Sequence, residues 1–542
     1  MDEKKEVNDT AKPQQDASKL TVSHGAGAMG DIVGIAKDPT PDQNRKENVF
    51  TTYELNANGL SVSVVVADIG SFVPEYRISV AGLGEATRVL LMSFRQEMLN
   101  LVPIDPNRIS DREYNKEMNQ KYIRASSLVI DKYLPQTPPD KKVMLTSYII
   151  NMMLGLGDIE IPLADDNLEE VVINSSKEPI WVYHKTYGWC KTNITLRDET
   201  TIYNAAEQIG RKVGRQITNL SPLMDAELSD GSRVNATLFP VSQNGNTITI
   251  RKFSKNPWTM TRLIDGGSIS KEMAALIWIC VQNEISLILS GGTASGKTSF
   301  LNSISMFMPP NHRIISVEET RELSLPSFLH WVPMLTRQPN PEGKGQITLY
   351  DLMINALRQR PDVILVGEVR TKPDALTLFE AIHTGHAVYG TIHADNAQDT
   401  IIRLVNPPID IPKLMLGAIG GVVSLFRHRR KGIRRVLEFG EVLKSGDINL
   451  LYRWNMRNDS FVQISEMTKL SETIALYGGY TRSELIDEIK ERASVLDWMV
   501  KNKVFELNTA GFVAAQYYNK RDKVLELVKS GVPYSEEAIN RL

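Results

Sequence analysis

Residues 287–302, LILSGGTASGKTSFLN, bring together the residue types that bind phosphate. Gly291, Gly296, Lys297 and Thr298 fit the pattern G-x-x-x-x-G-K-[ST], in which small residues let backbone N–H groups wrap around a phosphate. The lysine adds a point charge toward the β and γ oxygens, and the threonine hydroxyl is a ligand for Mg²⁺. A glycine turn without a ligand is the alternative. The residues predicted to contact the nucleotide are Gly291, Gly292, Thr293, Ala294, Ser295, Gly296, Lys297, Thr298 and Ser299.

Three other apolar runs end in acidic or imidazole side chains. HRIISVEE ends with Glu318 and Glu319, DVILVGE ends with Glu368, and AVYGTIH ends with His393. The carboxyl ends of parallel strands lie along one edge of an open sheet, which is where ligands bind. We therefore expect the phosphate loop, the carboxylates and the imidazole to meet in one crevice.

This set of groups suits hydrolysis of a nucleoside triphosphate. A carboxylate beside the γ-phosphate can orient and deprotonate water, and Mg²⁺ needs an acidic or water-mediated ligand. We assign Glu318 as the water-activating base and Lys297 as the catalytic cation. Thr298 and Glu368 are assigned to the Mg²⁺ side, directly or through water, and Glu319 is a further candidate metal ligand. The alternative is that these glutamates only cap strand ends in solvent.

The histidines near the last of these strand ends allow two interpretations. His383, His386 and His393 could form a zinc cluster, but no cysteine adds to the set and zinc sites are more tightly patterned. We instead expect His386 and His393 to hydrogen-bond on the γ-phosphate side and to report which nucleotide is bound. His383 is expected to be structural.

The element that must position these groups is a sheet. Residues 262–455 alternate short apolar runs with helical stretches, which predicts a parallel sheet with crossover helices. Residues 256–261 are a predicted linker, because proline and polar residues interrupt the pattern there. Residues 456–542 are expected to form a helical C-terminal region, with a capping box from Thr481 to Glu484.

The chain before residue 256 divides into three predicted parts. Residues 1–48 contain no aromatic residue and are rich in polar residues, a composition that predicts a disordered tail. Residues 49–139 alternate strand-like and helix-like runs, as in a small α/β subdomain. Residues 140–255 predict a second, α+β subdomain, with a helix whose apolar face runs from Ile202 to Val213.

The composition bounds the partners and the compartment. The 62 basic and 64 acidic side chains leave a net charge of -2, so no global field favours nucleic acid or anionic lipid. Cys190 and Cys280 lie far apart, which fits a reducing compartment without a disulfide framework. No secretory signal is recognised, and LMLGAIGGVVSLF, the longest apolar run, is shorter than the roughly 20 residues that span a bilayer. A cytoplasmic protein that reaches the membrane through a partner is expected.

Four stretches in this order resemble the secretion ATPase superfamily, which powers type II and type IV secretion, type IV pili and the archaellum. Its Walker A motif resembles GGTASGKT, its aspartate box ISVEETREL, its Walker B motif VILVGEVR and its histidine box TGHAVYGTIHAD. Gly367 before Glu368, in place of the usual Asp, is distinctive of the family. The match runs from about residue 140 to residue 443, and LRQRPDVILVGEVR, DGSRVNATLFPVS and RLVNPPIDIP are similar to the archaeal branch.

The resemblance implies an α/β fold, with a RecA-like P-loop ATPase domain after smaller α+β domains. It implies a homo-hexameric ring that uses ATP and Mg²⁺, each nucleotide lying between N-terminal and C-terminal domains. Arginines of the N-terminal domain reach the phosphates in this family, which makes Arg233 and Arg251 candidates, with Arg358 and Arg360 nearby in the motor domain. Arg is suited to this role because its planar fork spreads charge over transition-state oxygens.

Two residues depart from the family pattern. Glu319 stands in the aspartate box where an Asp is usual, which affects the magnesium geometry there. Glu227 stands where the archaeal pattern has an arginine, which weakens the case for a third arginine at the site. Neither change removes a residue that hydrolysis needs.

A basic cluster, RHRRKGIRR at residues 427–435, raises the possibility of nucleic-acid binding. It lies between two apolar strand-like runs with Gly432 in its middle, which favours a solvated hairpin tip or a subunit contact. No aromatic residues interleave it, whereas channels for single strands usually carry stacking platforms.

The predicted function is a cytoplasmic hexameric ATPase at the inner face of the cell membrane. It would couple hydrolysis to assembly of a type IV pilus-like filament, or to protein secretion, through a polytopic membrane platform protein. One alternative is archaellum assembly and rotation. A second is a nucleic-acid translocase on the same RecA-like core, which single-stranded DNA would stimulate, and a third is a scaffold that binds nucleotide without hydrolysis.

Overall fold

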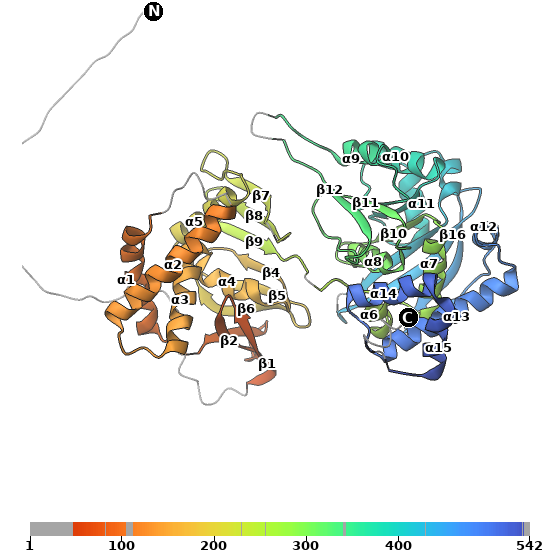
Figure 1. The fold of residues 1–542 in the computed structure, drawn as a ribbon. Helices are drawn as coiled ribbons and strands as arrows, with labels where there is room; N and C mark the ends of the chain where they lie inside the picture. Colours follow the sequence, from red (N-terminus) through yellow and green to blue (C-terminus); the bar gives the residue numbers. More distant parts are fainter. Residues whose placement is uncertain are drawn as a thin grey trace, which may run out of the picture.

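The protein has two lobes, each built on one nine-stranded sheet (Figure 1). The computed structural model describes residues 47–533 and 535, apart from 82, 104–111, 229, 255, 340–342 and 429. Of the tail predicted over residues 1–48, residues 1–46 therefore lie outside the described residues. The chain crosses from the first lobe to the second in an extended segment after residue 251 (Figure 1).

The sheet of the first lobe is mainly antiparallel, in the order β1-β2-β3-β6-β5-β4-β9-β8-β7, with β3 and β6 paired in parallel. Its strands are β1 (Asn48–Ala57), β2 (Leu60–Asp68), β3 (Glu75–Val80), β4 (Leu168–Ile173), β5 (Pro179–His184), β6 (Gly188–Thr195), β7 (Leu223–Glu227), β8 (Arg233–Thr237) and β9 (Thr247–Arg251). Its helices are α1 (Glu85–Leu101), α2 (Arg112–Tyr133), α3 (Pro139–Leu154), α4 (Glu160–Ala164), α5 (Glu199–Lys212) and the 3-10 helix η2 (Gly157–Ile159).

One core fills this lobe on both sides of the predicted boundary at residue 140. Strands β1–β3 precede that boundary and β4–β9 follow it, and the pairing of Tyr76 with Thr192 joins the two sets. Leu60, Val171 and Ile202 belong to the same buried apolar cluster. The two predicted subdomains thus share a sheet and a core, a long-range pairing that local patterns along the chain do not reveal.

The sheet of the second lobe has the order β12-β11-β13-β14-β10-β15-β16-β17-β18, parallel from β12 to β15 and antiparallel beyond. Its strands are β10 (Leu287–Gly291), β11 (Arg313–Glu318), β12 (His330–Leu335), β13 (Val363–Val366), β14 (Ala387–Ile392), β15 (Gly421–His428), β16 (Ile433–Val442), β17 (Ile448–Asn455) and β18 (Ser460–Gln463). Its helices are α6 (Met260–Asp265), α7 (Lys271–Gln282), α8 (Lys297–Ile304), α9 (Leu349–Leu357), α10 (Lys372–His383), α11 (Ala397–Val405), α12 (Lys469–Gly478), α13 (Arg482–Lys501), α14 (Leu507–Asn519) and α15 (Arg521–Ser530), with the 3-10 helices η3 (Ser305–Phe307) and η4 (Lys413–Ala418).

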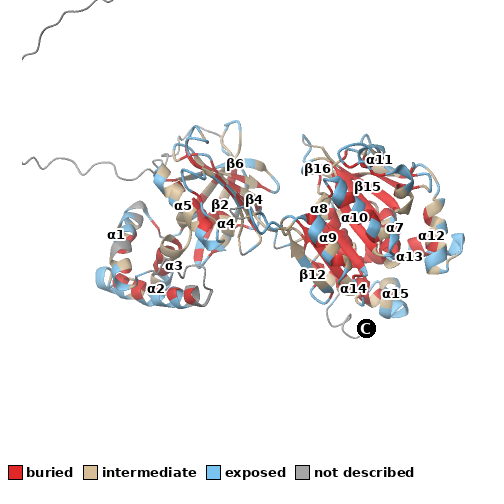
Figure 2. Ribbon diagram, turned by 90° about the horizontal axis from the view of Figure 1, so that it is seen from above, coloured by how far each residue is buried: buried red, intermediate tan, exposed pale blue. Residues whose placement is uncertain are grey.

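The parallel strands β10, β13 and β14 are buried on both faces, as the predicted crossover helices require, whereas the edge strand β12 is not (Figure 2). Along β13, Val363 and Leu365 join the apolar cluster that contains α7, and Ile364 and Val366 join the cluster that contains α10. Alternate side chains of one short strand therefore anchor it to helices on opposite faces. This double anchoring holds the strand ends in fixed positions.

The ends of the second lobe differ slightly from the predicted boundaries. Helix α6 begins at Met260 behind the cap Thr259, so it takes up the end of the segment predicted as a linker. Strand β18 pairs with β17, so the sheet continues beyond residue 455. Four helices follow among the described residues, and α13 begins with the predicted capping box of Thr481 and Glu484. Over the described residues, no helix combines the length and apolar character needed to cross a membrane.

Candidate functional site

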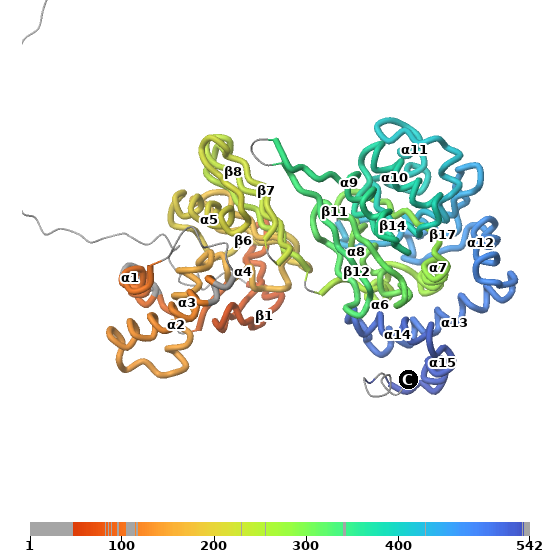
Figure 3. Tube along the Cα trace, turned by 45° about the horizontal axis from the view of Figure 1, so that its top comes forward, coloured from red at the N-terminus to blue at the C-terminus, as the bar shows by residue number. Residues whose placement is uncertain are grey.

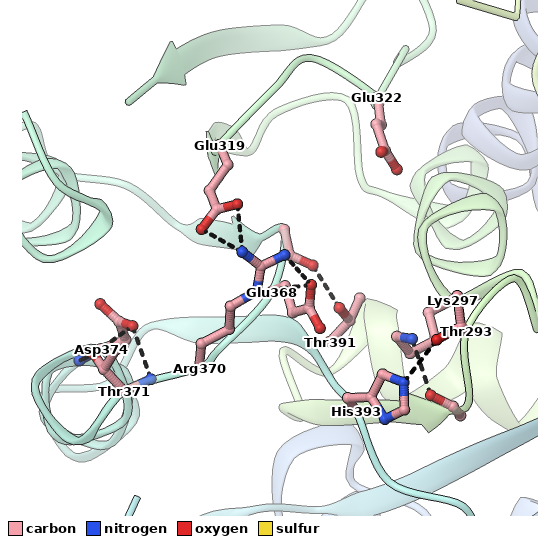
Figure 4. A network of polar contacts seen from close by, with 12 residues as sticks. Thr293, Lys297, Glu319, Glu322, Glu368, Arg370, Thr371, Asp374, Thr391 and His393 are labelled. Carbon is pink, nitrogen blue, oxygen red and sulfur yellow. Dashed lines mark hydrogen bonds and ion pairs between the residues drawn. The ribbon is translucent and has the colours of Figure 1, made fainter. Parts of the chain in front are cut away.

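The sheet order brings the four predicted strand ends to one edge. Strand β10 lies beside β14, β14 beside β13, and β13 beside β11, all in parallel. Their carboxyl ends carry the phosphate loop, His393, Glu368 and Glu318 in that order. The predicted adjacency of these strands is confirmed, and Figure 4 shows several of the side chains around this edge.

The phosphate loop has a backbone that only small residues can adopt at two points. Gly291 has a φ of 156°, and a Cβ there would lie 2.7 Å from the carbonyl oxygen of Leu425 on β15. Gly296 has a φ of 98° and caps α8 in the left-handed region. Ala294 is also left-handed, with a φ of 59°, which costs an ordinary L-residue about 1 kcal/mol. The loop thus stores local strain.

Lys297 lies over its own loop. Its Nζ donates to the carbonyl oxygens of Gly291 at 2.9 Å and Gly292 at 3.2 Å. Burial lowers the pKa of Lys297, and the charges of Glu368 and Glu322 oppose that shift. A poorly hydrated cation held by two neutral carbonyls is a strong attractor for a phosphate oxygen.

Arg370 bridges two of the predicted acidic residues (Figure 4). It donates to Glu368 Oε2 at 3.1 and 2.7 Å, and to both carboxylate oxygens of Glu319 at 2.8 and 2.6 Å. The Arg370 and Glu319 side chains are exposed by 54% and 44%, so water can compete for these contacts. The bridge holds the two carboxylates in place, yet a stronger cation can replace it.

Glu318 is buried, with 1% of its surface exposed. Its Oε1 accepts the backbone N–H groups of Glu322 at 2.9 Å and Leu323 at 3.0 Å. Its Oε2 is buried and has no hydrogen-bond partner in the described part of the chain. Burial raises the pKa of Glu318 to about 7, although the two backbone N–H groups oppose the shift. A carboxylate with this pKa suits proton transfer near neutral pH.

The two predicted histidines lie at opposite ends of β14. His393 follows the strand, and its Nε2 lies 3.1 Å from the Thr293 hydroxyl oxygen. His386 precedes the strand, and its Nδ1 lies 3.0 Å from the Thr384 hydroxyl oxygen. A strand of this length separates its ends by roughly 20 Å. Within this chain, His393 therefore lies at the phosphate-loop edge of the sheet and His386 at the opposite edge, and the contact of either histidine with the γ-phosphate stays a prediction.

His383 ends α10, where its Nδ1 lies 2.7 Å from the carbonyl oxygen of Phe379. This contact with the last turn of the helix fits the structural role expected of it. No group of three His, Cys, Asp or Glu side chains in the described residues is placed to hold a metal ion.

The edge fits a nucleotide with Mg²⁺. The buried hydroxyl of Ser295 has no hydrogen-bond partner within the described residues and can donate to a phosphate oxygen. Thr298 is the second residue of α8, at the positive end of the helix, and the carboxylate of Glu368 could supply an oxygen ligand. Mg²⁺ commonly takes one or two protein oxygens and completes its shell with phosphate and water, which suits this sparse set.

The sequence profile of the type II/IV secretion system protein family matches residues 158–439, more than half of the chain. The chain belongs to this family of secretion ATPases. The match spans the phosphate loop, all four strand ends and all of β4–β9, so both lobes contribute to it.

Two relatives from one organism support the same membership. MJ0900, an uncharacterized protein of Methanocaldococcus jannaschii, is 34% identical over 74% of this chain and 72% of its own. MJ0781 of the same organism is 26% identical over 91% of this chain and 92% of its own. The solved structure of the Legionella pneumophila ATPase DotB covers 69% of this secretion ATPase and 91% of DotB, with 18% identity and a TM-score of 0.38.

The predicted arginines of this secretion ATPase fall into two groups. Arg233 starts β8 and pairs with Glu322 at 3.2 Å, which links the first lobe to the loop after β11. Arg251 lies directly opposite Arg233 in the β8–β9 register. Arg358 and Arg360 precede β13, at the edge of the sheet opposite to the phosphate loop, so the structure does not bring them to this site within one chain.

The sequence interpretation missed three side chains at this edge. Arg370 binds Glu368 and Glu319. Glu322 pairs with Arg233, and its negative charge opposes the fall in the pKa of Lys297 that burial causes. Arg434 contacts the phosphate loop. Arg370 lies in the stretch VILVGEVR and Glu322 in ISVEETREL. Each is a charged side chain close to a strand end, and that proximity was the signal in the sequence that could have identified both.

Glu227 is the residue that departs from the family pattern. Its carboxylate accepts the backbone N–H of Arg321, and burial raises its pKa.

Proposed function

We propose that the protein is a RecA-like ATP-hydrolysing motor of a hexameric ring at the inner face of the cell membrane. It drives assembly of a type IV pilus-like filament, or protein secretion, through a polytopic membrane platform protein. One observation carries the proposal: the phosphate loop and the ends of β11 and β13 meet at one edge, and Arg233 of the other lobe reaches the loop that follows β11.

In this structure, the groups proposed to bind the nucleotide contact other groups of the protein, which a phosphate or a metal ion would replace. Lys297 exchanges the carbonyl oxygens of Gly291 and Gly292 for the β- and γ-phosphate oxygens. Thr298 and Glu368 would hold Mg²⁺, and the ion would spread the charge of the phosphates. Arg370 would then release Glu368 and keep its contacts with Glu319.

Hydrolysis needs a base and cations around the transferred phosphoryl group. Glu318 takes the proton of the attacking water, since its pKa near 7 balances ionisation and basicity at neutral pH. Arg233 and Arg251 stabilise the negative charge that the equatorial oxygens carry in the transition state. His393 hydrogen-bonds near the γ-phosphate through its place beside Thr293.

The contact between Arg233 and Glu322 gives hydrolysis a route to motion. A change of charge at the phosphates alters the field on the loop that carries Glu322, and Arg233 transmits the change to β8 and the first lobe. An electrostatic contact between two lobes is a two-state element of the kind that couples nucleotide state to domain position. The motor thereby pushes on the platform.

The proposal is tested in cells that carry Lys297→Ala at the native locus, by counting thin surface filaments in electron micrographs and tracking swimming. We expect filaments to vanish while swimming persists. Loss of swimming with filaments retained means that the protein drives the archaellum, against the proposal. Purified protein adds two checks: stimulation by single-stranded DNA indicates a nucleic-acid translocase, and a Glu318→Gln protein with the unmutated rate refutes the assigned base.

A further inference from the structure

The basic cluster at residues 427–435 has a position that its sequence did not reveal. Strand β15 runs in parallel beside β10, with Leu425 opposite Gly291, the residue where β10 enters the phosphate loop. Three more residues of β15 extend past this point, and β16 returns after a turn. The hairpin therefore rises beside the phosphate loop.

Two arginines face each other in this hairpin. Arg427 lies directly opposite Arg434 in the antiparallel register, so both side chains start from the same face of the sheet. Arg434 Nε donates to the carbonyl oxygen of Ala294 at 3.1 Å, and Arg427 Nη2 donates to the hydroxyl of Tyr183 on β5 at 2.7 Å. One strand pair thus contacts the phosphate loop and the sheet of the first lobe.

The charge on these two arginines is not neutralised. Like charges directly opposite each other destabilise a strand pair, and neither guanidinium forms an ion pair with a carboxylate in the described part of the chain. The neighbouring Arg435 contrasts with them, because it is 8% exposed and its Nε and Nη2 each lie 2.8 Å from Asp459 oxygens. Arg435 holds the fold together, whereas Arg434 keeps its charge beside an anion site.

The contact of Arg434 falls on the strained residue of the loop. Ala294 has a φ of 59°, and its carbonyl oxygen is the one that Arg434 holds. The Cδ atom of Arg434 also lies 3.6 Å from where a Cβ on Gly296 would be. Lys297 must leave its carbonyls to meet a phosphate, but Arg434 can keep Ala294 in place throughout.

We propose that the β15–β16 hairpin is a strut between the phosphate loop and the first lobe. Arg434 is a positioning residue that holds the loop in its binding shape through Ala294, and Arg427 fixes the hairpin to Tyr183. Movement of the first lobe thereby changes the affinity of the loop for nucleotide. The inference rests on the proposed function, because it gives that same phosphate loop a mechanical link.

The test measures the affinity of the full-length protein for ADP with Mg²⁺ by calorimetry. Arg434→Gln should weaken binding about tenfold, the effect of losing a charge-assisted hydrogen bond, and Arg434→Lys should recover part of it. Arg430→Gln removes the same charge from the same hairpin without a contact to the loop, and should stay within about twofold. In ATP hydrolysis, Arg434→Gln should raise KM and leave kcat within about twofold, as expected for loss of uniform binding.

A double-mutant cycle tests the strut. Tyr183→Phe removes the hydroxyl that accepts from Arg427, and should weaken ADP binding about threefold although Tyr183 lies on another sheet. In the Arg434→Gln protein the same change should have no further effect, because the link to the loop is already cut. The strut is contradicted if the two substitutions weaken ADP binding by factors that multiply in the double variant. It is also contradicted if Tyr183→Phe alone leaves ADP binding unchanged.

The outcomes separate this inference from the proposed function. Wild-type protein that binds no ADP and hydrolyses no ATP contradicts the proposed function. Wild-type protein that binds ADP, with Arg434→Gln binding as tightly as Arg430→Gln, leaves the proposed function standing and overturns the positioning role of Arg434.

Discussion

Two arginine–carboxylate networks in the second lobe have opposite characters. At the strand ends, Arg370 joins Glu319 and Glu368, and all three side chains have 26% or more of their surface exposed. In the C-terminal helices, Arg492 pairs with Glu488 on α13, and these side chains are 1% and 8% exposed. Both networks use the same two kinds of group, yet the Arg492–Glu488 pair is shielded from water and the Arg370 contacts are not.

The difference in burial predicts that one network stabilises the fold and that the other can open at the site. Arg492 also donates to Gln282 at 2.5 Å and lies over the rings of Trp278 and Tyr517, so it joins α13 to α7 and α14. Glu488 also pairs with Arg521, so removing Arg492 takes away one of its two cations in a site that water cannot fill freely, which is costly. The exposed network costs little to open, which a site that exchanges cations requires.

The largest effect should come from the exposed network. Glu368→Gln removes a charge from the proposed Mg²⁺ side, and we expect kcat for ATP to fall by several hundredfold or more while ADP binding is retained. Phosphate release under saturating ATP measures this. Glu380→Gln on α10 is the matched control, and equal rates for the two variants would show that Glu368 has no part in hydrolysis.

Breaking the buried network should lower the stability of the second lobe. Arg492→Met leaves Glu488 without one of its partners, and we expect the unfolding free energy of the second lobe to fall by about 3 kcal/mol. Denaturant unfolding followed by tryptophan fluorescence reports it through Trp278. Lys490→Met, on an exposed face of the same helix, should cost less than about 0.5 kcal/mol, and a similar loss in both variants would contradict the comparison.

Glu318 gives the comparison a pH dependence. Burial raises its pKa from 4.5 to about 7, so between these values the folded state holds the proton more tightly than the unfolded chain. Stability from this group is therefore full below pH 4.5 and is lost as the pH rises through 7. Glu318→Gln should raise the Tm by about 2–4 °C at pH 8, with a smaller gain at pH 5. A gain independent of pH would contradict the raised pKa of Glu318.

The smallest effect should come from Arg370. If it competes with Mg²⁺ for Glu368, Arg370→Gln should lower the Mg²⁺ concentration for half-maximal ATP binding by about fivefold, the factor for 1 kcal/mol. The Tm should change little, because the contacts are exposed. A higher Mg²⁺ requirement would place Arg370 on the substrate instead.

The strand ends of the second sheet could be predicted because local patterns encode them. Each parallel strand is a short apolar run followed by its functional residue, as at Glu318 and Glu368, and the rule for parallel sheets then places these residues together. The same rule separates His386 from this edge within one chain. It lies close to His393 in sequence, yet it precedes the strand that His393 follows.

The first sheet and the bridging side chains depend on contacts that no local pattern encodes. The pairing of β3 with β6 joins residues more than one hundred positions apart, so the predicted boundary at residue 140 falls inside one core. Arg434 belonged to a cluster interpreted as a hairpin tip, and its role beside Ala294 follows from the register of β15 with β10. The positive charge alone could not show that Arg434 contacts the phosphate loop whereas Arg435 pairs with Asp459.

The most direct test of the central claim is ATP hydrolysis by the purified full-length protein, wild type against Lys297→Ala, with Mg²⁺ present. The account predicts steady phosphate release by the wild type and a loss of on the order of a hundredfold or more in the variant, whose melting temperature stays unchanged. Equal rates in the two proteins would contradict a hydrolysis site at this edge of the sheet.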